Sequence, residues 1–184
     1  MEMPVVIAMF RAVNVGGRQV KKDTLIAIHK AVGCMEPETL ITSGNVVFTT
    51  RVRKLDELAK RIEEEFERAA GFRSEAILRT HDELCDAVTR NPFAGRAGID
   101  PSRLLIHFLA TRPSKAAIAA TMAMDVAPEE MHVAGREMYV HYPNGLGRSK
   151  FPAVKVGKAL GGIASTGRNL NTVIRLMEIA AARG

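Results

Sequence analysis

An order of apolar runs and amphipathic segments begins again in the second half of this chain, and that partial repetition limits the folds available to it more than any other feature. An apolar strand at residues 5–12 is followed by a helix that begins near Asp23. Two strands at 38–42 and 46–50 come next, and then an amphipathic helix that ends at Gly71 and a strand at 74–79. The first part of the chain therefore predicts the order β-α-β-β-α-β.

Local signals at the ends of these segments support the same order. Asp23 is suited to cap the first helix, and Gly33 to end it in a left-handed conformation. Gly44-Asn45 is a hairpin signal, and a two-residue turn there would place Ile41, Val46 and Phe48 on one face and Thr42, Val47 and Thr49 on the other. Residues 80–83 have the spacing of a capping box before a short helix that Asn91-Pro92 ends.

After a stretch rich in Gly, Ala and Pro at residues 96–101, the order begins again. A buried strand at 104–110 leads to an Ala-rich helix at 114–124. Strands at 131–134 and 137–142 are predicted to form a hairpin that turns at Gly135-Arg136. Helices at 153–160 and 169–183 complete the chain.

These segments predict an α+β protein made of two ferredoxin-like (βαββα-type) halves. We expect mostly antiparallel sheets with helices packed on one face, and an additional helix at the C-terminus. The predicted domains are 1–95, the N-terminal ferredoxin-like half, and 102–184, a C-terminal α+β half with basic loops and a terminal helix.

The composition is that of a soluble globular protein. Of the 184 residues, 47% are apolar and 25% are charged, and no apolar run is long enough for a membrane helix. No secretory signal is evident near the N-terminus, so we expect a cytoplasmic protein without a membrane partner. Cys34 and Cys85 lie far apart in the sequence, which argues against a CxxC motif or a disulfide. Cys85 falls among the apolar helical positions Leu84, Ala87 and Val88, which favours a small buried apolar role for it.

The formal net charge of +6 is concentrated near the C-terminus. Residues 138–184 hold seven Lys and Arg against a single carboxylate, Glu178, whereas the preceding residues are balanced. Such a basic region favours phosphate, nucleic acid or another acidic partner, although a mild basic excess also serves solubility alone.

Loops that combine Gly, Asn, Arg, Ser and Lys are the best functional clue. The first loop, residues 11–22, follows the opening strand and precedes a helix. In this arrangement, backbone N–H groups and the N-terminus of the helix favour the binding of an anion. Similar loops occur at residues 43–45, 147–150 and 166–169. The candidate anion-binding residues are Arg11, Asn14, Gly16, Gly17, Arg18, Arg148, Ser149, Lys150, Arg168 and Asn169.

Each loop also has a purely structural interpretation. Asn14 and its glycines are ordinary turn formers, and neither this loop nor residues 145–150 has the spacing of a P-loop or a dinucleotide fingerprint. Thr166 or Asn169 is suited simply to cap the last helix. The binding hypothesis has a sharper form, in which Arg18, Arg148 and Arg168 lie around one cleft.

The predicted hairpin near residue 135 places five polar or aromatic residues on the face that points away from the core. Two histidines and two carboxylates on such a face could bind a metal or transfer protons, but a solvated polar face is the commoner arrangement, and we predict no metal. His107 is expected to be a hydrogen-bonded core histidine. No Ser/His/Asp or Cys/His arrangement is evident from local spacing. The five hairpin residues are Glu130, His132, Glu137, Tyr139 and His141.

As a set, five segments resemble the domain-of-unknown-function family numbered 1697. They are residues 11–17, 42–48, 91–93, 139–150 and 166–172, in that order along nearly the whole chain. The resemblance implies an α+β fold of ferredoxin-like character. It implies no established activity, cofactor or catalytic residue.

The sequence thus supports one leading functional hypothesis and leaves two others open. The leading hypothesis is a binding protein for phosphate-bearing ligands, either nucleic acid or a nucleotide. Because only 5% of residues are aromatic, contact with backbone phosphates or with a small phosphorylated molecule is favoured over base stacking. The alternatives are an enzyme acting on a small phosphorylated or carboxylated metabolite, and a non-catalytic protein-interaction module. The cofactor, the catalytic residues and the existence of a homodimer stay open.

Overall fold

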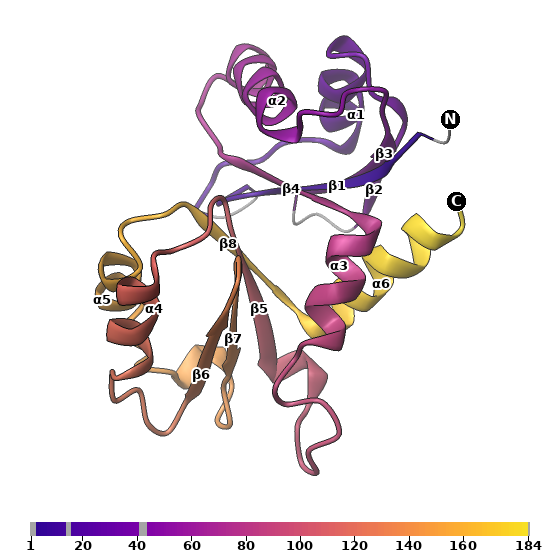
Figure 1. Cartoon of the computed structure of the whole chain (residues 1–184). Helices are drawn as coiled ribbons and strands as arrows, with labels where there is room; N and C mark the ends of the chain where they lie inside the picture. The colour runs from indigo at the N-terminus through magenta and orange to yellow at the C-terminus, as the bar shows by residue number, and fades with distance from the viewer. Residues whose placement is uncertain (1–2, 14–15, 41–43, 184) are drawn as a thin grey trace. The chain divides into compact units, whose positions relative to one another are not determined.

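The computed structural model describes residues 3–13, 16–40 and 44–183. The chain forms two compact units, shown in one ribbon view in Figure 1. The first unit comprises Met1–Cys85 together with Arg175–Gly184, and the second comprises Asp86–Ile174. Each is described separately below.

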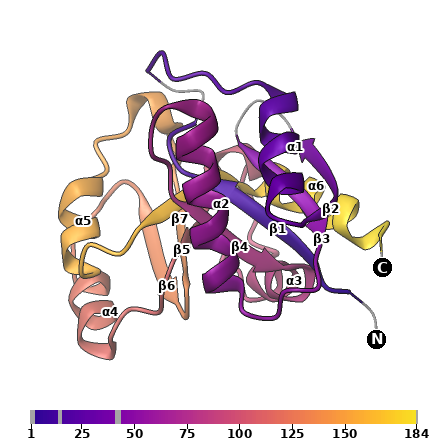
Figure 2. The same ribbon diagram turned by 90° about the horizontal axis from the view of Figure 1, so that it is seen from above.

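The first unit contains a four-stranded sheet in the order β2-β3-β1-β4. Every neighbouring pair is antiparallel, as a β-α-β-β-α-β chain requires when each helix crosses over one intervening strand. Helices α1 (Lys22–Ala31) and α2 (Leu55–Ala70) lie across the sheet on one side (Figure 2). The strands are β1 (Val5–Phe10), β2 (Met35–Leu40), β3 (Asn45–Thr49) and β4 (Ala76–Thr80).

Alternation along the strands builds the core of this unit. Val6, Ala8 and Phe10 of β1 point toward the helices, where they join the apolar stripe of α2 that includes Ile62 and Phe66. The rings of Phe10 and Phe66 lie 4.9 Å apart between centroids. The first sheet is therefore anchored to α2 by aromatic packing.

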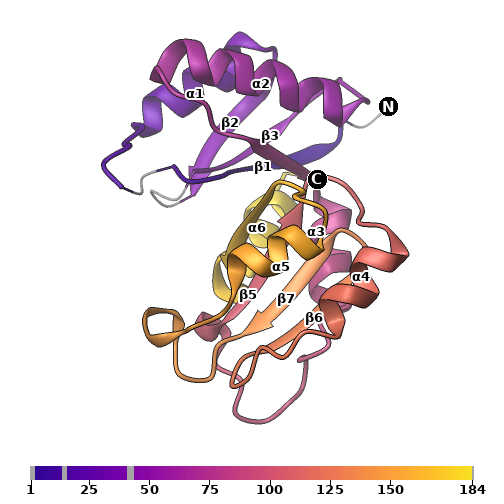
Figure 3. The same ribbon diagram turned by 90° about the vertical axis from the view of Figure 1, so that its left-hand side faces the viewer.

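The second unit repeats this architecture. Its sheet has the order β6-β7-β5-β8, again with antiparallel neighbours. Helices α4 (Lys115–Met122) and α5 (Ala153–Ala159) lie on one face of the sheet (Figure 3). The strands are β5 (Leu104–Leu109), β6 (Glu130–Ala134), β7 (Glu137–His141) and β8 (Ser165–Asn169).

The last strand of each set runs directly into a further helix. Helix α3 (His81–Thr89) follows β4, and helix α6 (Leu170–Ala181) follows β8. The short 3-10 helices η1 (Pro101–Arg103) and η2 (Leu146–Arg148) precede β5 and follow β7. The predicted fold class, two ferredoxin-like α+β halves with an additional C-terminal helix, is confirmed.

Several local signals act as predicted. Gly71 ends α2 in the left-handed conformation, with φ of 78°. In the capping box of α3, the N–H of Glu83 donates to Thr80 Oγ1 at 3.2 Å, and the N–H of Thr80 donates to Glu83 Oε2 at 2.9 Å. The turn at Gly135-Arg136 contains two residues, since Ala134 and Glu137 pair directly.

Two local predictions are wrong. Asp23 lies in the first turn of α1 rather than at its cap, which is Lys21 and makes no side-chain cap bond. The predicted two-residue turn at Gly44-Asn45 does not form, because Asn45 already belongs to β3 and pairs with Leu40. Residues 41–43, including the predicted faces of Ile41 and Thr42, lie outside the described residues.

Gly44 itself has a packing reason to be glycine. Its φ is 71°, and a Cβ atom at this position would lie 3.1 Å from the Cβ atoms of both Phe10 and Val13. The chain therefore approaches the end of β1 closely at a place where a side chain would crowd the core.

The division between the two units falls within α3, between Cys85 and Asp86. The sequence-based division places residues 86–95 in the first domain, whereas in the structure they group with the second sheet. The reason is that α3 ends against β7, where the hydroxyl of Tyr139 donates to the carbonyl of Ala87 at 2.7 Å. The boundaries 1–95 and 102–184 stay a prediction about which segments fold by themselves.

Candidate functional site

The first basic loop has the predicted backbone but its arginines already have partners. Gly16 and Gly17 have φ of 62° and 84° and are exposed shortly before α1. A guanidinium nitrogen of Arg11 lies 3.5 Å from Glu75 Oε1, and the guanidinium of Arg18 lies over the ring of Phe72, 5.5 Å from its centroid. Asn14 lies outside the described residues. Anion binding at this loop stays a prediction.

The loop after β7 leaves its cations available. Arg148 and Lys150 are exposed, and neither makes an ion pair or side-chain hydrogen bond within the part of the chain that the structure describes. The hydroxyl of Ser149 is occupied, because it donates to Glu129 Oε1 at 2.5 Å and accepts from the N–H of Phe151 at 2.9 Å. Ser149 thus holds the loop in place rather than presenting its hydroxyl to solvent.

The sequence predicts a basic loop at residues 166–169, and this prediction is wrong. Residues 165–169 form β8, an edge strand in which Arg168 pairs with Ile106 of β5. The guanidinium of Arg168 is buried and donates to Thr166 Oγ1 at 2.7 Å and to the carbonyl of Gly167 at 2.9 Å. Burial lowers its pKa to about 10. Asn169 caps α6, since its Oδ1 accepts from the N–H of Thr172 at 2.9 Å.

A pocket of about 400 Å³ lies in the second unit beside the basic loop. Residues 124–127, between α4 and β6, form one wall, and Lys150, Pro152 and Lys155 form the other. Lys150 is the predicted anion-binding residue that the pocket includes; Arg148 and Arg168 are not among its lining residues. Arg18 belongs to the other unit, so convergence of all three arginines stays a prediction.

The outward face of β7 is covered rather than solvated, which corrects the expectation of an open polar face. Glu137, Tyr139 and His141 alternate along one face of β7, as predicted, and all three are buried. Residues 87–96 cover them. Arg90 pairs with Glu137 at 3.3 Å, and burial together with Glu137 raises the pKa of Tyr139 to about 12.

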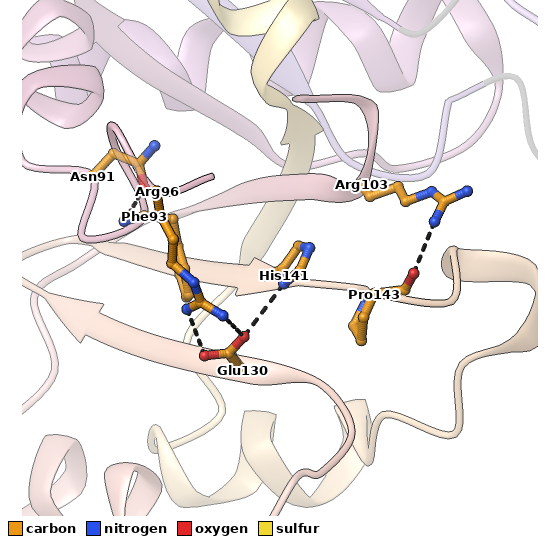
Figure 4. Close-up of polar contacts among 7 residues, drawn as sticks. All are labelled: Asn91, Phe93, Arg96, Arg103, Glu130, His141 and Pro143. Atoms are coloured by element: carbon orange, nitrogen blue, oxygen red, sulfur yellow. Dashed lines mark hydrogen bonds and ion pairs between the residues drawn. The ribbon is translucent and has the colours of Figure 1, made fainter. Parts of the chain in front are cut away.

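A polar cluster closes the end of this covered face (Figure 4). Arg96 donates to both oxygens of Glu130, at 2.7 and 2.6 Å, and Nδ1 of His141 lies 3.5 Å from Glu130 Oε1. These contacts, that with Arg96 foremost, hold the pKa of Glu130 below its usual range. The ring of Phe93 lies beside both the Arg96 guanidinium and the His141 ring, at 5.7 and 6.0 Å.

The cluster brings together two motifs that are remote in the sequence. Asn91 accepts the N–H of Phe93 through its side chain at 3.0 Å, which shapes the chain so that Phe93 reaches His141. Arg103, at the same end of the sheet, donates to the carbonyl of Pro143 at 2.8 Å. The motif residues near 91 and 141 therefore serve at least the folding of this unit.

No group of three or more metal-ligating side chains occurs among the described residues. His107 lies in β5 as predicted, but its Nε2 atom is buried without a hydrogen-bond partner in residues 3–13, 16–40 and 44–183. Burial, with a smaller contribution from Arg168, lowers the pKa of His107 to about 4. The expected hydrogen-bonded core histidine is instead a ring packed against Gly167.

A Cys/His pair that the sequence analysis missed lies on α3. Sγ of Cys85 is 3.4 Å from Nε2 of His81, and both side chains are partly exposed. The spacing of four residues on a helix is the signal that could have found it, since such residues share a face. Cys85 is therefore not the buried apolar residue that its neighbours suggest.

The fold and these contacts define an α+β protein built from two β-α-β-β-α-β units, each followed by a helix. A family model described as "Protein of unknown function (DUF1697)" matches residues 3–139, and the chain belongs to this family. No curated protein matches the sequence significantly. Within the described residues, none of the helices has the length and apolar character needed to span a bilayer.

One solved structure extends the likeness to the whole fold. The conserved bacterial protein SP0830 from Streptococcus pneumoniae is similar to this chain with a TM-score of 0.78 at 19% identity, over 98% of this chain and 99% of that one. An unknown protein from Galdieria sulphuraria aligns over 91% of this chain and 98% of its own, with a TM-score of 0.26 and 13% identity. The first likeness shows a shared fold.

Proposed function

We propose that this protein binds phosphate-bearing ligands, nucleic acid or a nucleotide, through the basic segment formed by residues 145–160. The observation that carries the proposal is a set of four exposed cations without carboxylates beside them in the sequence. None of the four forms an ion pair or a side-chain hydrogen bond with the residues that the structure describes. The four are Arg148, Lys150, Lys155 and Lys158.

Their availability distinguishes these cations from several arginines elsewhere. Arg96 is held by Glu130, Arg175 by Glu178, and Arg183 by Glu38 at 2.8 Å. A guanidinium already paired with a carboxylate must give up that partner before it binds a phosphate. The cations of the basic segment have no such pair to break, and a mixture of guanidinium and ammonium groups suits phosphate oxygens.

The distribution of aromatic side chains favours contact with phosphates over contact with bases. Phe93, Tyr139 and Tyr142 of the second unit are buried, and the partly buried ring of Phe151 packs against Tyr142 at 5.8 Å between centroids, so these rings offer little surface on which a base could stack. Binding through phosphates alone is insensitive to sequence and weakens steeply as salt is added.

The test is a fluorescence anisotropy titration of the full chain with a labelled single-stranded RNA of random sequence and with ATP, at several salt concentrations. One variant replaces all four cations of the basic segment with Ala. The matched control removes four exposed cations of the first unit, namely Lys22, Lys30, Arg51 and Lys60.

We expect the first variant to lose most of its affinity for both probes, while the control binds like the natural protein. For RNA, the slope of the logarithm of the binding constant against the logarithm of the salt concentration should become less negative by about 0.7 for each phosphate contact removed. Equal affinity of the basic-segment variant and the control would contradict the proposal.

A further inference from the structure

We infer that the pocket beside the basic segment is a binding site for a small phosphate monoester that also carries hydroxyl groups, of the size of a pentose phosphate. This inference rests on the proposed function and names the ligand class within it. It also assigns roles to Asp125 and Lys155, which the loop motifs do not include.

The size of the pocket favours a small molecule. Its volume of about 400 Å³ is large enough for a small metabolite, since small-molecule sites span about 300 to 1,000 Å³. A nucleic-acid strand contacts a protein along an open charged surface and needs no such hollow.

The charges in the pocket lie on two different walls. Lys150 precedes α5 and Lys155 lies within its first turn, whereas Asp125 comes from the segment that follows α4. A phosphate monoester carries a charge of about −1.5 to −2 at neutral pH, which two ammonium groups can balance. A carboxylate on the facing wall would repel a second phosphate but accepts hydrogen bonds from hydroxyl groups.

The carboxylate of Asp125 is already oriented. Its Oδ1 atom accepts from the backbone N–H of Ala127 at 3.1 Å, and the side chain remains exposed. Met124, Val126 and Pro152 add apolar surface to the lining. A short carbon frame that carries a phosphate and hydroxyl groups matches a lining that combines ammonium, carboxylate and apolar groups.

The two walls are tied together within the second unit. The hydroxyl of Ser149, next to Lys150, donates to the buried carboxylate of Glu129, which lies two residues beyond Ala127. The bond holds the basic wall against the acidic wall before any ligand arrives. Less conformational freedom is then lost on binding.

The experiment is isothermal titration calorimetry of the full chain with ribose 5-phosphate, unphosphorylated ribose and inorganic phosphate. The pocket variant is Lys150→Ala with Lys155→Ala. Its control is Arg112→Ala with Lys115→Ala, which removes two exposed cations of the same unit outside the pocket and the basic segment. A third variant, Asp125→Asn, removes the charge but keeps an oxygen that can accept the Ala127 N–H.

We expect ribose 5-phosphate to bind the natural protein and the control more tightly than inorganic phosphate does, and ribose not to bind measurably. The pocket variant should lose about tenfold or more in affinity for ribose 5-phosphate, as the loss of charge-assisted hydrogen bonds implies. Asp125→Asn should narrow the preference for ribose 5-phosphate over inorganic phosphate, because it weakens the acceptor for the hydroxyl groups.

Two results would overturn the inference. Equal affinity for ribose 5-phosphate and inorganic phosphate would indicate a bare anion site. Unchanged binding by the pocket variant would place the ligand elsewhere. After either of these results, the RNA titration decides whether the proposed function also fails. If replacing all four cations of the basic segment abolishes RNA binding, the proposed function stands without the pocket. If RNA binding is unchanged, the proposed function and the inference both fail.

Discussion

The buried His29 in α1 should make the first unit sensitive to acid. Its side chain is fully buried, and its ring packs against Phe10 and Phe48 at centroid distances of 5.9 and 5.1 Å. Nδ1 lies 2.8 Å from the carbonyl of Leu25, and Nε2 is buried without a hydrogen-bond partner among the described residues. Burial lowers the pKa of His29 from 6.5 to about 4.

The sign of the effect follows from where the proton binds. The unfolded chain takes up a proton on His29 below pH 6.5, whereas the folded chain resists it down to about pH 4. The contribution of the neutral His29 side chain to the free energy of unfolding is therefore complete above pH 6.5. It is lost progressively as the pH falls from 6.5 to about 4. The full loss amounts to about 3 kcal/mol for this one residue.

The perturbation is His29→Phe, which keeps an aromatic ring in the core but cannot be protonated. The carbonyl of Leu25 remains satisfied by the helical N–H of residue 29. Urea unfolding, followed by circular dichroism between pH 7.5 and 4.5, gives the free energy of unfolding of both proteins. Titration of the His29 ring proton by NMR gives its pKa directly.

We expect the free energy of unfolding of the variant, measured relative to that of the natural protein, to rise by about 2 to 3 kcal/mol between pH 7.5 and 4.5. The contributions of the other titrating groups cancel in this difference. Parallel stability curves, or an NMR pKa near 6.5, would refute the reasoning.

Two further predictions concern close packing and thiol exposure. Gly167→Ala should destabilise the second unit by about 1 to 3 kcal/mol in urea unfolding, because a Cβ there would lie 2.9 Å from Cε1 of His107. Gly157→Ala in α5, where no atom lies within 4 Å of the added Cβ, is the control and should be neutral or stabilising by up to about 1 kcal/mol. In thiol titration with Ellman's reagent at neutral pH, Cys85 should react well before Cys34, which is buried and whose pKa burial raises to about 12. Faster modification of Cys34, read by mass spectrometry, would contradict that order.

The parts of the fold that sequence patterns predict well are those set by neighbouring residues. The capping box from Thr80 to Glu83 and the turn at Gly135-Arg136 depend on contacts within four residues, and both form as predicted. The order of strands and helices follows equally from local periodicity. Each of these features is decided before distant parts of the chain meet.

The edge strand β8 shows where local patterns fail. Ser165–Asn169 contains no large apolar residue, so it lacks the composition of a strand and is suggestive of a loop. It becomes a strand because β5 offers it an unpaired edge, and Arg168 is then buried against its own backbone. Pairing with a distant partner overrides the local preference.

The candidate site was predictable only in part for the same reason. Lys150 is recognisable from its basic loop, whereas Lys155 and Asp125 join it through the packing of α4 and α5 on one face of the sheet. Likewise, nothing in the sequence of β7 reveals that residues 87–96 will cover Glu137 and Tyr139.

In the second unit, charged side chains that are paired within the fold can be distinguished from exposed cations that are available to a ligand. This distinction separates residues with a structural role from candidate ligand-binding residues. The polar face of β6 and β7, for which the pattern alone leaves metal binding or proton transfer as an alternative to a solvated surface, uses its charges internally: Glu137 pairs with Arg90, and Glu130 with Arg96. A charge that the fold has satisfied stabilises the fold, and recruiting it for a ligand costs the energy of that pair. The cations of residues 145–160 are exposed without such partners in the described chain, and for that reason the search for a ligand begins with them rather than with the histidines.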